Sequence, residues 1–335
     1  MINFENLSLL NLHTNSLYTQ PQLLKLLENN NAEYLEVNDD IYLLQKSEYN
    51  FQQIFFWINK NDKNNQPVNL FKEKNLVLEY ILLEKQEKIH IIDNWLKTNQ
   101  FIEFRIFIRM FQIRQSYNLQ YVSTNNITNP TDSDYNEIKN ILETNFNIFS
   151  EKIPNINELK SLENSTYLIK RNNQIAALLI SEKKGKTEEL RYWVVLTEYR
   201  SMGYGSDLMK YFLNLNKETL RFTLWVDIRN IDAIEKYKYF QFKKDKLINN
   251  IYINKKIMKE KIIEILTETR PEFIFSEPDL KFIDSGYLDS FDIVTIVSDI
   301  ESYFDVKIDG SLILPENFQN IDSIINLIQK SKNAL

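Results

Sequence analysis

The sequence has no cysteine, two histidines, five glycines and seven prolines among its 335 residues. Without cysteine the chain can form no disulfide, use no thiolate nucleophile and bind no metal through sulfur. The two histidines, His13 and His90, have no other candidate metal ligands close to them in the sequence, so we expect no zinc site. The composition therefore predicts a protein that works without a bound metal ion.

Long apolar runs are missing as well. No segment approaches the ~18 consecutive apolar residues that a membrane-spanning helix needs. The first residues, Met1 to Asn6, show neither the basic segment nor the apolar core of a secretory signal. No basic stripe indicates a nucleic-acid-binding face. We expect a cytoplasmic protein with no membrane span and no nucleic-acid partner.

The material that is present suffices for two or three packed domains. The chain has a mass of 40.1 kDa and is 43% hydrophobic and 13% aromatic. Its net charge is −6, yet residues 258–335 alone contain 15 acidic and 7 basic side chains. The last segment is therefore predicted to be a separate acidic domain, and its apolar spacing predicts helices.

Two of the five glycines stand together in the segment Arg200-Ser201-Met202-Gly203-Tyr204-Gly205. Glycine averages about 7% of ordinary sequences, so a chain this poor in it is expected to keep it where the backbone needs it. A strand-like run, 190–196, precedes the segment and a helix-like run, 206–215, follows it. Free amides at a helix N-terminus attract phosphate, because orphan N–H groups and the helix dipole point to one place. The segment lacks the Gly-Lys-Ser/Thr of a Walker A loop and the third glycine of the dinucleotide fingerprint.

The surrounding sequence adds a second motif at a fitting distance. Strands 166–170 and 174–180 are predicted to be joined by Asn172-Asn173 as a hairpin turn. After the glycine loop come the strand Leu224-Trp225-Val226-Asp227, then Asn230-x-x-Ala233-Ile234-x-x-Tyr237 and a closing Phe242. In this order the segment resembles the GNAT superfamily of acyl-CoA N-acyltransferases. The resemblance implies an α/β domain, 116–255, with a mixed, mostly antiparallel sheet and helices on both faces.

The resemblance also implies which residues bind the donor, acetyl-CoA or another acyl-CoA. The loop amides would hold the pyrophosphate, and the end of the preceding strand would pair with the pantetheine arm where that strand splays from the next. The residues implied are Val194, Val195, Arg200, Ser201, Met202, Gly203, Tyr204, Gly205 and Asn230.

Acyl transfer needs a neutral amine, a polarised carbonyl and a proton for the leaving thiolate. By the resemblance Tyr237 gives that proton; otherwise it is a core tyrosine of an aromatic cluster. Glu188 and Glu189 lie where the family often places a base, and Glu189 is preferred because strand alternation puts it on the face of Trp193. Both could instead be solvated edge residues. The family usually has glycine where this chain has Gln241. This departure makes it uncertain whether the turn before Phe242 forms as in the family.

The acidic segment contains Gly286-Tyr287-Leu288-Asp289-Ser290-Phe291-Asp292-Ile293-Val294, with Leu-Asp-Ser at a loop-to-helix junction. In this motif residues 258–335 resemble the acyl and peptidyl carrier proteins. The resemblance implies an all-α, four-helix carrier domain with 4′-phosphopantetheine attached to Ser290. A serine at a helix N-terminus is exposed, and a phosphate there faces free amides. The alternative is that Ser290 is a simple N-cap.

The leading segment, 1–115, has the order strand 76–83, helix 88–96 and strand 104–112, without any glycine. It is either a degenerate copy of the transferase fold, unable to bind coenzyme A through a glycine loop, or an unrelated α/β cap that shapes the acceptor pocket. The sequence leaves both alternatives open.

Together the two resemblances predict an N-acyltransferase fused to its own carrier. Acyl-CoA is the donor and a group on Ser290 the acceptor, or the loaded arm is itself the donor; the first is slightly preferred. Expected partners are a phosphopantetheinyl transferase, a cargo-loading enzyme such as an adenylating ligase or acyl synthase, and a small-molecule amine. The rival is a non-catalytic GNAT-like module that docks the carrier for other enzymes, which Gln241 and the uncertain base favour.

Overall fold

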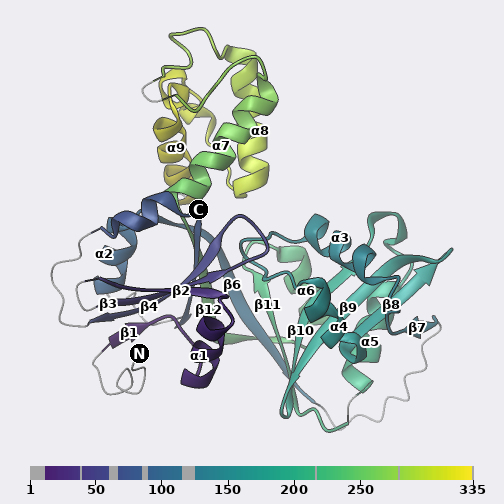
Figure 1. Ribbon diagram of the computed structural model, residues 1–335. Coiled ribbons are helices and arrows are strands. Elements are labelled where there is room, and N and C mark those ends of the chain that lie inside the picture. Colours follow the sequence, from purple (N-terminus) through teal and green to yellow (C-terminus); the bar gives the residue numbers. More distant parts are fainter. Residues whose placement is uncertain are drawn as a thin grey trace. The chain divides into compact units, whose positions relative to one another are not determined.

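The computed structural model (Figure 1) describes residues 12–37, 40–59, 67–84, 90–114, 125–215, 217–277 and 280–333. The chain divides into two compact units. The first contains Met1–Glu79, Lys88–Phe104 and Tyr252–Leu335, and the second contains Tyr80–Glu87 and Arg105–Ile251. The three domains 1–115, 116–255 and 258–335 stay a prediction, and the boundary predicted at 115/116 lies outside the described residues.

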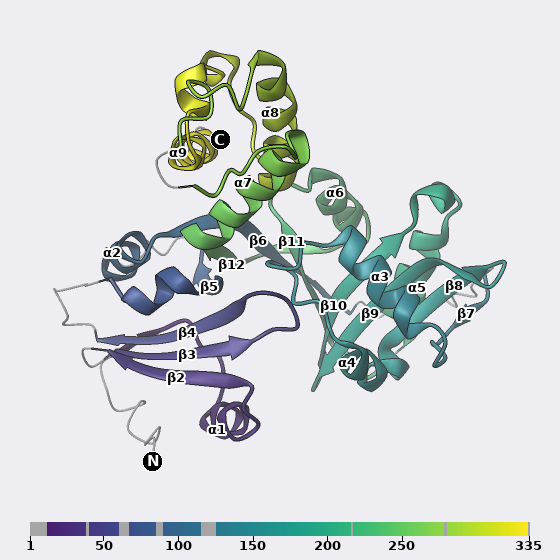
Figure 2. The ribbon, with the colours of Figure 1, turned by 45° about the horizontal axis from the view of Figure 1, so that its top comes forward.

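The first unit begins with a small sheet. Its elements are β1 (Leu12–Thr14), α1 (Gln20–Glu28), β2 (Ala32–Val37), β3 (Asp40–Lys46), β4 (Gln52–Asn59), η2 (Asn69–Glu73) and α2 (His90–Thr98). Strands β2, β3 and β4 form antiparallel hairpins and lie side by side in Figure 2. Aromatic side chains fill the core beside them: Tyr42, Phe56, Phe71 and Trp95 are all fully buried, with ring centroids 5.1–6.1 Å apart.

Three longer strands contribute residues to both units: β5 (Leu76–Leu83), β6 (Phe101–Ile113) and β12 (Lys243–Asn254). Strand β5 begins parallel to β4, with Gln52 opposite Leu76 and Gln53 opposite Val77. Beyond this point the edge of β4 is taken by β1, which pairs antiparallel with residues 57–59. Asn15 fills the remaining space: its Nδ2 donates to the carbonyls of Ile54 and Glu79 (3.0 and 2.9 Å), and its Oδ1 accepts from the amide of Phe56 (2.8 Å).

The C-terminal part of the first unit is helical. The described elements are α7 (Lys255–Thr269), α8 (Ser290–Phe304), η5 (Gly310–Leu312), η6 (Pro315–Phe318) and α9 (Ile321–Asn333). Their apolar residues form a packed core with Phe304, Phe318, Ile324 and Ile328 fully buried. The predicted four-helix carrier domain is not shown, because these residues form three α-helices and two 3₁₀ helices.

The second unit contains a mixed sheet in the order β6-β11-β10-β9-β8-β7. Its other elements are β7 (Ile127–Thr128), α3 (Tyr135–Asn145), α4 (Ile156–Ser161), η3 (Glu163–Ser165), β8 (Thr166–Arg171), β9 (Gln174–Lys184), β10 (Thr187–Val195), η4 (Thr197–Tyr199), α5 (Tyr204–Leu215), β11 (Arg221–Asp227) and α6 (Ile231–Tyr239). Asn172 and Asn173 form the predicted hairpin turn, both with positive φ. Pairing is antiparallel throughout except between β10 and β11, which are parallel.

Helices cover both faces of this sheet. Leu208, Met209 and Phe212 of α5 are fully buried in a core that includes Leu190 of β10. On the opposite face Phe146, which follows α3, packs against Tyr192 with ring centroids 5.1 Å apart. No helix in the described part of the chain is both long and apolar enough to cross a membrane.

Candidate active site

Strands β10 and β11 separate near their carboxyl ends. They pair from Thr187 opposite Arg221 to Leu190 opposite Leu224 and no further. A bulge at Arg191 interrupts the pairing of β10 with β9 at the same place. Because a bulge bends and twists its strand, β10 turns away from β11 here. From Tyr192 to Val195, in the residues described, the edge of β10 that faced β11 has no partner strand.

The glycine loop leads from the end of this strand into α5. Gly203 has φ +82°, and Ser201 also takes a left-handed backbone with φ +67°. Within the described ranges, the backbone N–H groups of Gly203, Tyr204, Gly205 and Ser206 donate no hydrogen bond, since the bond from Asp207 to Gly203 O is the first of the helix. Four free amides at the positive end of a helix dipole form a site for an anion.

Gly205 permits close contact between α5 and β10. A Cβ atom at this position would lie 3.1 Å from Cγ2 of Val195 and 3.2 Å from Cζ2 of Trp193. Any other residue would therefore push the start of the helix away from the open strand edge. The second glycine of the motif thus holds the free amides against the strand, while Gly203 provides the left-handed turn.

A cation that sequence reasoning did not identify lies beside the loop. Arg171, at the end of β8, donates through Nε to the hydroxyl of Tyr204 (2.6 Å), and its guanidinium lies 5.0 Å from the centre of that ring. Its Nη2 donates to Oδ1 of Asn125 (2.8 Å). The hairpin brings this charge to the first residue of α5, which no spacing in the sequence indicated. Arg200 itself is exposed.

Tyr237 lies on α6 beside the open edge of β10. Its ring is 5.6 Å from that of Trp193 and 6.0 Å from that of Phe242. Among the described residues its hydroxyl has no hydrogen-bond partner. Burial raises the pKa of this hydroxyl, because the phenolate would lose solvation. Tyr237 is therefore protonated at neutral pH and is free to donate.

Two neighbouring polar residues have structural roles. Asn230 is the N-cap of α6 and accepts from the amide of Ala233 (3.1 Å). Gln241 takes φ +65°, the conformation that explains a glycine preference at this position. The turn forms nonetheless, and the amide of Phe242 donates to Tyr237 O (3.0 Å). The doubt that Gln241 raised about the local turn is thereby removed.

The two glutamates considered as a base occupy different environments. Glu188 is 4% exposed and accepts from the hydroxyls of Ser181 (2.9 Å) and Thr219 (3.0 Å). Glu189 is partly exposed and lies 3.7 Å from Lys184. The expectation that strand alternation puts Glu189 and Trp193 on one face is wrong, because the bulge at Arg191 shifts the alternation.

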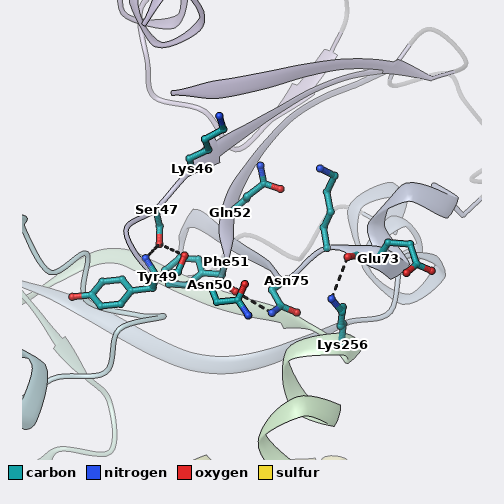
Figure 3. Close-up of a pocket in the computed structure, with 10 residues that line it drawn as sticks. Lys46, Ser47, Tyr49, Asn50, Phe51, Gln52, Glu73, Asn75 and Lys256 are labelled. Atoms are coloured by element: carbon teal, nitrogen blue, oxygen red, sulfur yellow. Dashed lines mark hydrogen bonds between the residues drawn. The ribbon is translucent and has the colours of Figure 1, made fainter. Parts of the chain in front are cut away.

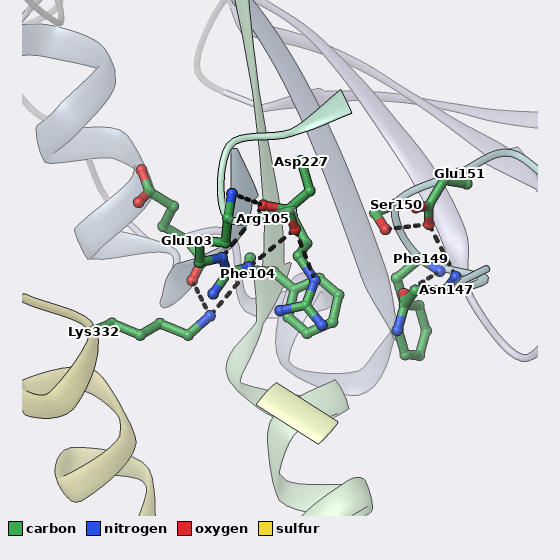
Figure 4. Close-up of polar contacts among 10 residues, drawn as sticks. Glu103, Phe104, Arg105, Asn147, Phe149, Ser150, Glu151, Asp227 and Lys332 are labelled. Carbon is green, nitrogen blue, oxygen red and sulfur yellow. Dashed lines mark hydrogen bonds and ion pairs between the residues drawn. The ribbon is translucent and has the colours of Figure 1, made fainter. Parts of the chain in front are cut away.

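A buried polar cluster near the open strands contains a third carboxylate. Glu151, in the loop after α3, accepts through Oε2 from the amide of Asn147 (2.9 Å) and from Ser150 Oγ (2.6 Å). Burial raises its pKa. Close by in Figure 4, Asp227 ends β11 and is paired with Arg229 (3.2 Å) and Arg105 (3.6 Å). Nothing in the sequence signalled Glu151, because the charged residues that act on it, Arg105 and Asp227, are far from it along the chain.

In the first unit, Ser290 is the first residue of α8 and is exposed. Asp289 caps the helix, accepting from the amides of Phe291 (2.7 Å) and Asp292 (3.1 Å). These two amides, and to a lesser extent Arg270, hold the pKa of Asp289 below its usual range. Arg270 donates to the carboxylates of both Asp289 and Asp292. The N-cap alternative for Ser290 is therefore wrong. Its hydroxyl has no partner in the described ranges, and Phe291 beside it is 86% exposed.

The first unit also contains a hollow of about 340 Å³ at the start of α7 (Figure 3). Three lysines line it. Lys74 pairs with Glu33 (2.7 Å) and Lys256 with Glu260 (3.3 Å), and the third is Lys46. Two of the three lysines in this hollow are therefore already paired with carboxylates. No group of three or more histidine, aspartate or glutamate side chains in the described part could hold a metal ion.

Comparison with family models matches residues 135–242 to the acetyltransferase (GNAT) family. This segment is a GNAT domain. It contains the bulge, the glycine loop and Tyr237, and it does not extend to residues 258–335. A comparison with curated proteins found no match.

Several solved structures show distant likeness. A GCN5-related N-acetyltransferase from Sphaerobacter thermophilus is 9% identical, and the match covers 64% of this chain and 76% of the other, with a TM-score of 0.45. A GCN5-related N-acetyltransferase from Kribbella flavida is 8% identical, and the match covers 72% of this chain and 97% of the other, with a TM-score of 0.44. A tandem GNAT protein from the clavulanic acid biosynthesis pathway is 9% identical, with 64% and 78% covered and a TM-score of 0.40. Likeness at this level says nothing about the substrate.

Proposed function

We propose that the GNAT domain transfers an acyl group, acetyl by preference, from acyl-CoA to an amine. The observation that carries the proposal is the open edge of β10 beside four free amides at the start of α5. The amides of residues 203–206 are suited to the pyrophosphate, and residues 192–195 to the amide groups of pantetheine. A thioester held this way would lie between the diverging ends of β10 and β11.

The chemistry then requires a proton for the departing thiolate. Tyr237 packs against Trp193 of the open strand and has a free, protonated hydroxyl. As the amine nitrogen attacks the carbonyl carbon, the C–S bond breaks and the sulfur takes the proton of Tyr237. The preference for Tyr237 over a merely structural tyrosine is supported by this unused hydroxyl.

Acetyl-CoA binding, measured by calorimetry, together with thiol release in the presence of amines tests the proposal. Gly203→Asp places a carboxylate among the four amides and should weaken acetyl-CoA binding at least about tenfold through charge repulsion. Gly185→Asp is the matched control, because Gly185 also has positive φ and open space around it. Absence of both binding and turnover would favour the non-catalytic docking module instead.

We also propose that Ser290 carries 4′-phosphopantetheine. Support comes from its exposed hydroxyl at the first position of α8, with capping supplied by Asp289. The residues fit such a group, because the Ser290 hydroxyl is exposed and has no hydrogen-bond partner among the described residues. The arm, when attached, would supply a thiol that holds an acyl or aminoacyl group as a thioester.

The carrier proposal is tested by mass spectrometry after incubation with coenzyme A and a phosphopantetheinyl transferase. The chain should gain the mass of one arm, and Ser290→Ala should abolish the gain. Ser285→Ala is the control, because Ser285 lies in the preceding loop. A gain that persists in Ser290→Ala contradicts the proposal. The cargo-loading enzyme and the amine acceptor remain proposed partners, with acyl-CoA preferred as the donor.

We further propose that the N-terminal α/β part is a degenerate copy of the GNAT fold. In both parts three antiparallel strands precede a parallel one: β2-β3-β4 then β5, and β8-β9-β10 then β11. The helices that follow, α2 and α6, are each followed by a glutamine with positive φ: Gln100 at +57° and Gln241 at +65°. In the N-terminal part Leu96 stands where Tyr237 stands, four residues before the glutamine. The copy therefore lacks both the loop and the proton donor.

A further inference from the structure

Acyl transfer to an ammonium substrate needs a base, since only the neutral amine has a free electron pair. Glu188 is sealed by two hydroxyl groups and Glu189 lies beside Lys184. Asp227 is paired with two arginines. We propose that Glu151 accepts the proton of the amine through Oε1, a role that rests on the proposed acyltransferase function.

The first support is the way Glu151 is held. Both donors to its carboxylate, the amide of Asn147 and Ser150 Oγ, bind the same oxygen, Oε2. Within the described ranges Oε1 has no partner. One oxygen thus fixes the orientation of the group, and the other remains an acceptor.

The second support is its place beside the diverging strands. Tyr192, the first residue of β10 beyond the bulge, donates from its hydroxyl to the backbone carbonyls of Glu151 (3.0 Å) and Lys152 (2.8 Å). The charges of Arg105 on β6 and Asp227 at the end of β11 act on the Glu151 carboxyl. Figure 4 shows Arg105, Asp227 and Glu151 in one region. The carboxylate therefore lies near the ends of both strands that open the cleft.

The third support is electrostatic. Burial raises the pKa of Glu151 above its ordinary value of 4.5, Ser150, Asn147 and Arg105 lower it, and Asp227 raises it again. Arg191 also reaches the loop, because its Nη2 donates to the carbonyl of Lys152 (3.4 Å), and Glu158 acts on neighbouring Tyr192. No cation donates directly to the carboxylate among the residues described. A carboxylate of raised pKa is a stronger base than an exposed one.

The step balances as follows. The ammonium gives one proton to Oε1, and the freed nitrogen pair forms the C–N bond while the C–S bond breaks. The sulfur takes the proton of Tyr237. The second nitrogen proton, released when the amide forms, restores the tyrosine through solvent, and Glu151 returns its proton to solvent. The products are the amide, coenzyme A and one proton.

The test is the pH dependence of kcat/KM in the full chain with acetyl-CoA and primary amines as probes: phenethylamine, spermidine and a peptide with a free N-terminus. In the wild type kcat/KM should rise as the pH rises through the pKa of Glu151. At pH values above this pKa, Glu151→Gln should lower kcat/KM about 100-fold or more. The deficit should shrink as the pH approaches the pKa of the probe amine, because an amine that is already neutral needs no base.

Ser150→Ala sharpens the test. Ser150 stabilises the charged carboxylate, so its removal should raise the pKa of Glu151 and move the acidic limb to higher pH with activity retained above it. Glu143→Gln, a surface glutamate of α3 paired with Lys139, is the control and should match the wild type. A merely structural role for Glu151 would lower activity equally at all pH values.

The outcomes separate the two proposals. If the wild type acetylates a probe while Glu151→Gln keeps its pH profile, or loses activity uniformly, the role of Glu151 is overturned and the acyltransferase stands. If the wild type binds no acetyl-CoA and acetylates no probe, the acyltransferase itself is overturned, and the role of Glu151 with it.

Discussion

Strands β4 and β5 of the first unit and strands β10 and β11 of the second begin in the same way and end differently. Each pair is parallel at its start and stops pairing after a few residues. Between β4 and β5 the chain itself fills the opening, with β1 on one edge and Asn15 bridging both strands. Between β10 and β11 the described residues leave the edge unpaired. Divergence of two parallel strands thus leaves an unpaired strand edge only where no other segment satisfies the exposed backbone groups.

The largest effect is expected at Tyr237 of α6, the proposed proton donor beside the open edge of β10. Tyr237→Phe removes only the hydroxyl, so kcat should fall about 100-fold or more while the Kd for acetyl-CoA stays within about twofold. Steady-state kinetics and calorimetry measure the two values. Tyr239→Phe on the same helix, 72% exposed, is the control. An unchanged kcat would mean that Tyr237 only packs in the core, as Leu96 does on α2.

The closed strand pair, β4 and β5, should depend on Asn15 for its stability. Asn15→Ala removes three hydrogen bonds to strand backbone and should lower the free energy of unfolding by about 2–3 kcal/mol, at about 1 kcal/mol for each bond. Urea unfolding measures it. Asn214→Ala, which removes one exposed bond to Lys210 O, should cost much less. Equal costs would show that Asn15 does not hold β4 and β5 together.

The open strand pair, β10 and β11, should depend on Gly205 for the close contact between β10 and the start of α5. Gly205→Ala places a methyl group 3.1 Å from Val195 and 3.2 Å from Trp193, and should cost about 1–2 kcal/mol of stability. It should also weaken acetyl-CoA binding, because the start of α5 moves. Gly310→Ala, with open space around it, is the reference in thermal unfolding. Unchanged binding would mean that the position of the helix start does not matter.

The smallest effect is expected at the glutamine turns after α2 and α6, where the N-terminal part and the GNAT domain have the same backbone conformation. Gln100 and Gln241 both have positive φ, and the amide of each donates to a lysine carbonyl three residues earlier (3.0 and 2.8 Å). Glycine removes the left-handed strain but is more flexible when unfolded. Each substitution to glycine should therefore raise the free energy of unfolding by about 0.5 kcal/mol. Opposite signs at the two sites would show that the turns are not equivalent.

Much of the GNAT domain was predictable because its signals are local. The Asn172-Asn173 turn and the glycine loop between a strand and a helix all appear where the residue types demand them, and residues 135–242 match the family. In the C-terminal segment apolar spacing predicted helices, and α7, α8 and α9 form there. The fourth helix was implied only by the carrier resemblance and is not shown, because the described residues between α8 and α9 form short 3₁₀ helices.

The proposed base, Glu151, could not be found in the same way. Strand alternation pointed to Glu189, but the bulge at Arg191 shifts that alternation, and a bulge leaves no mark in an apolar pattern. Glu151 gains its environment from Tyr192, Arg105 and Asp227, each about 40 or more residues away. The role of Asn15 could not be predicted either, because it donates hydrogen bonds to backbone carbonyls of two strands 39 and 64 residues further along the chain.

The sequence by itself determined that a glycine-containing turn stands between a strand and a helix, that Tyr237 follows at a fitting distance, and that Ser290 begins a helix. These follow from backbone conformations and helix ends, which depend on a few neighbouring residues. Only the tertiary structure decided which pair of parallel strands stays open and which carboxylate lies beside it. Those outcomes depend on long-range packing, where one bulge or one bridging asparagine determines which backbone groups remain free.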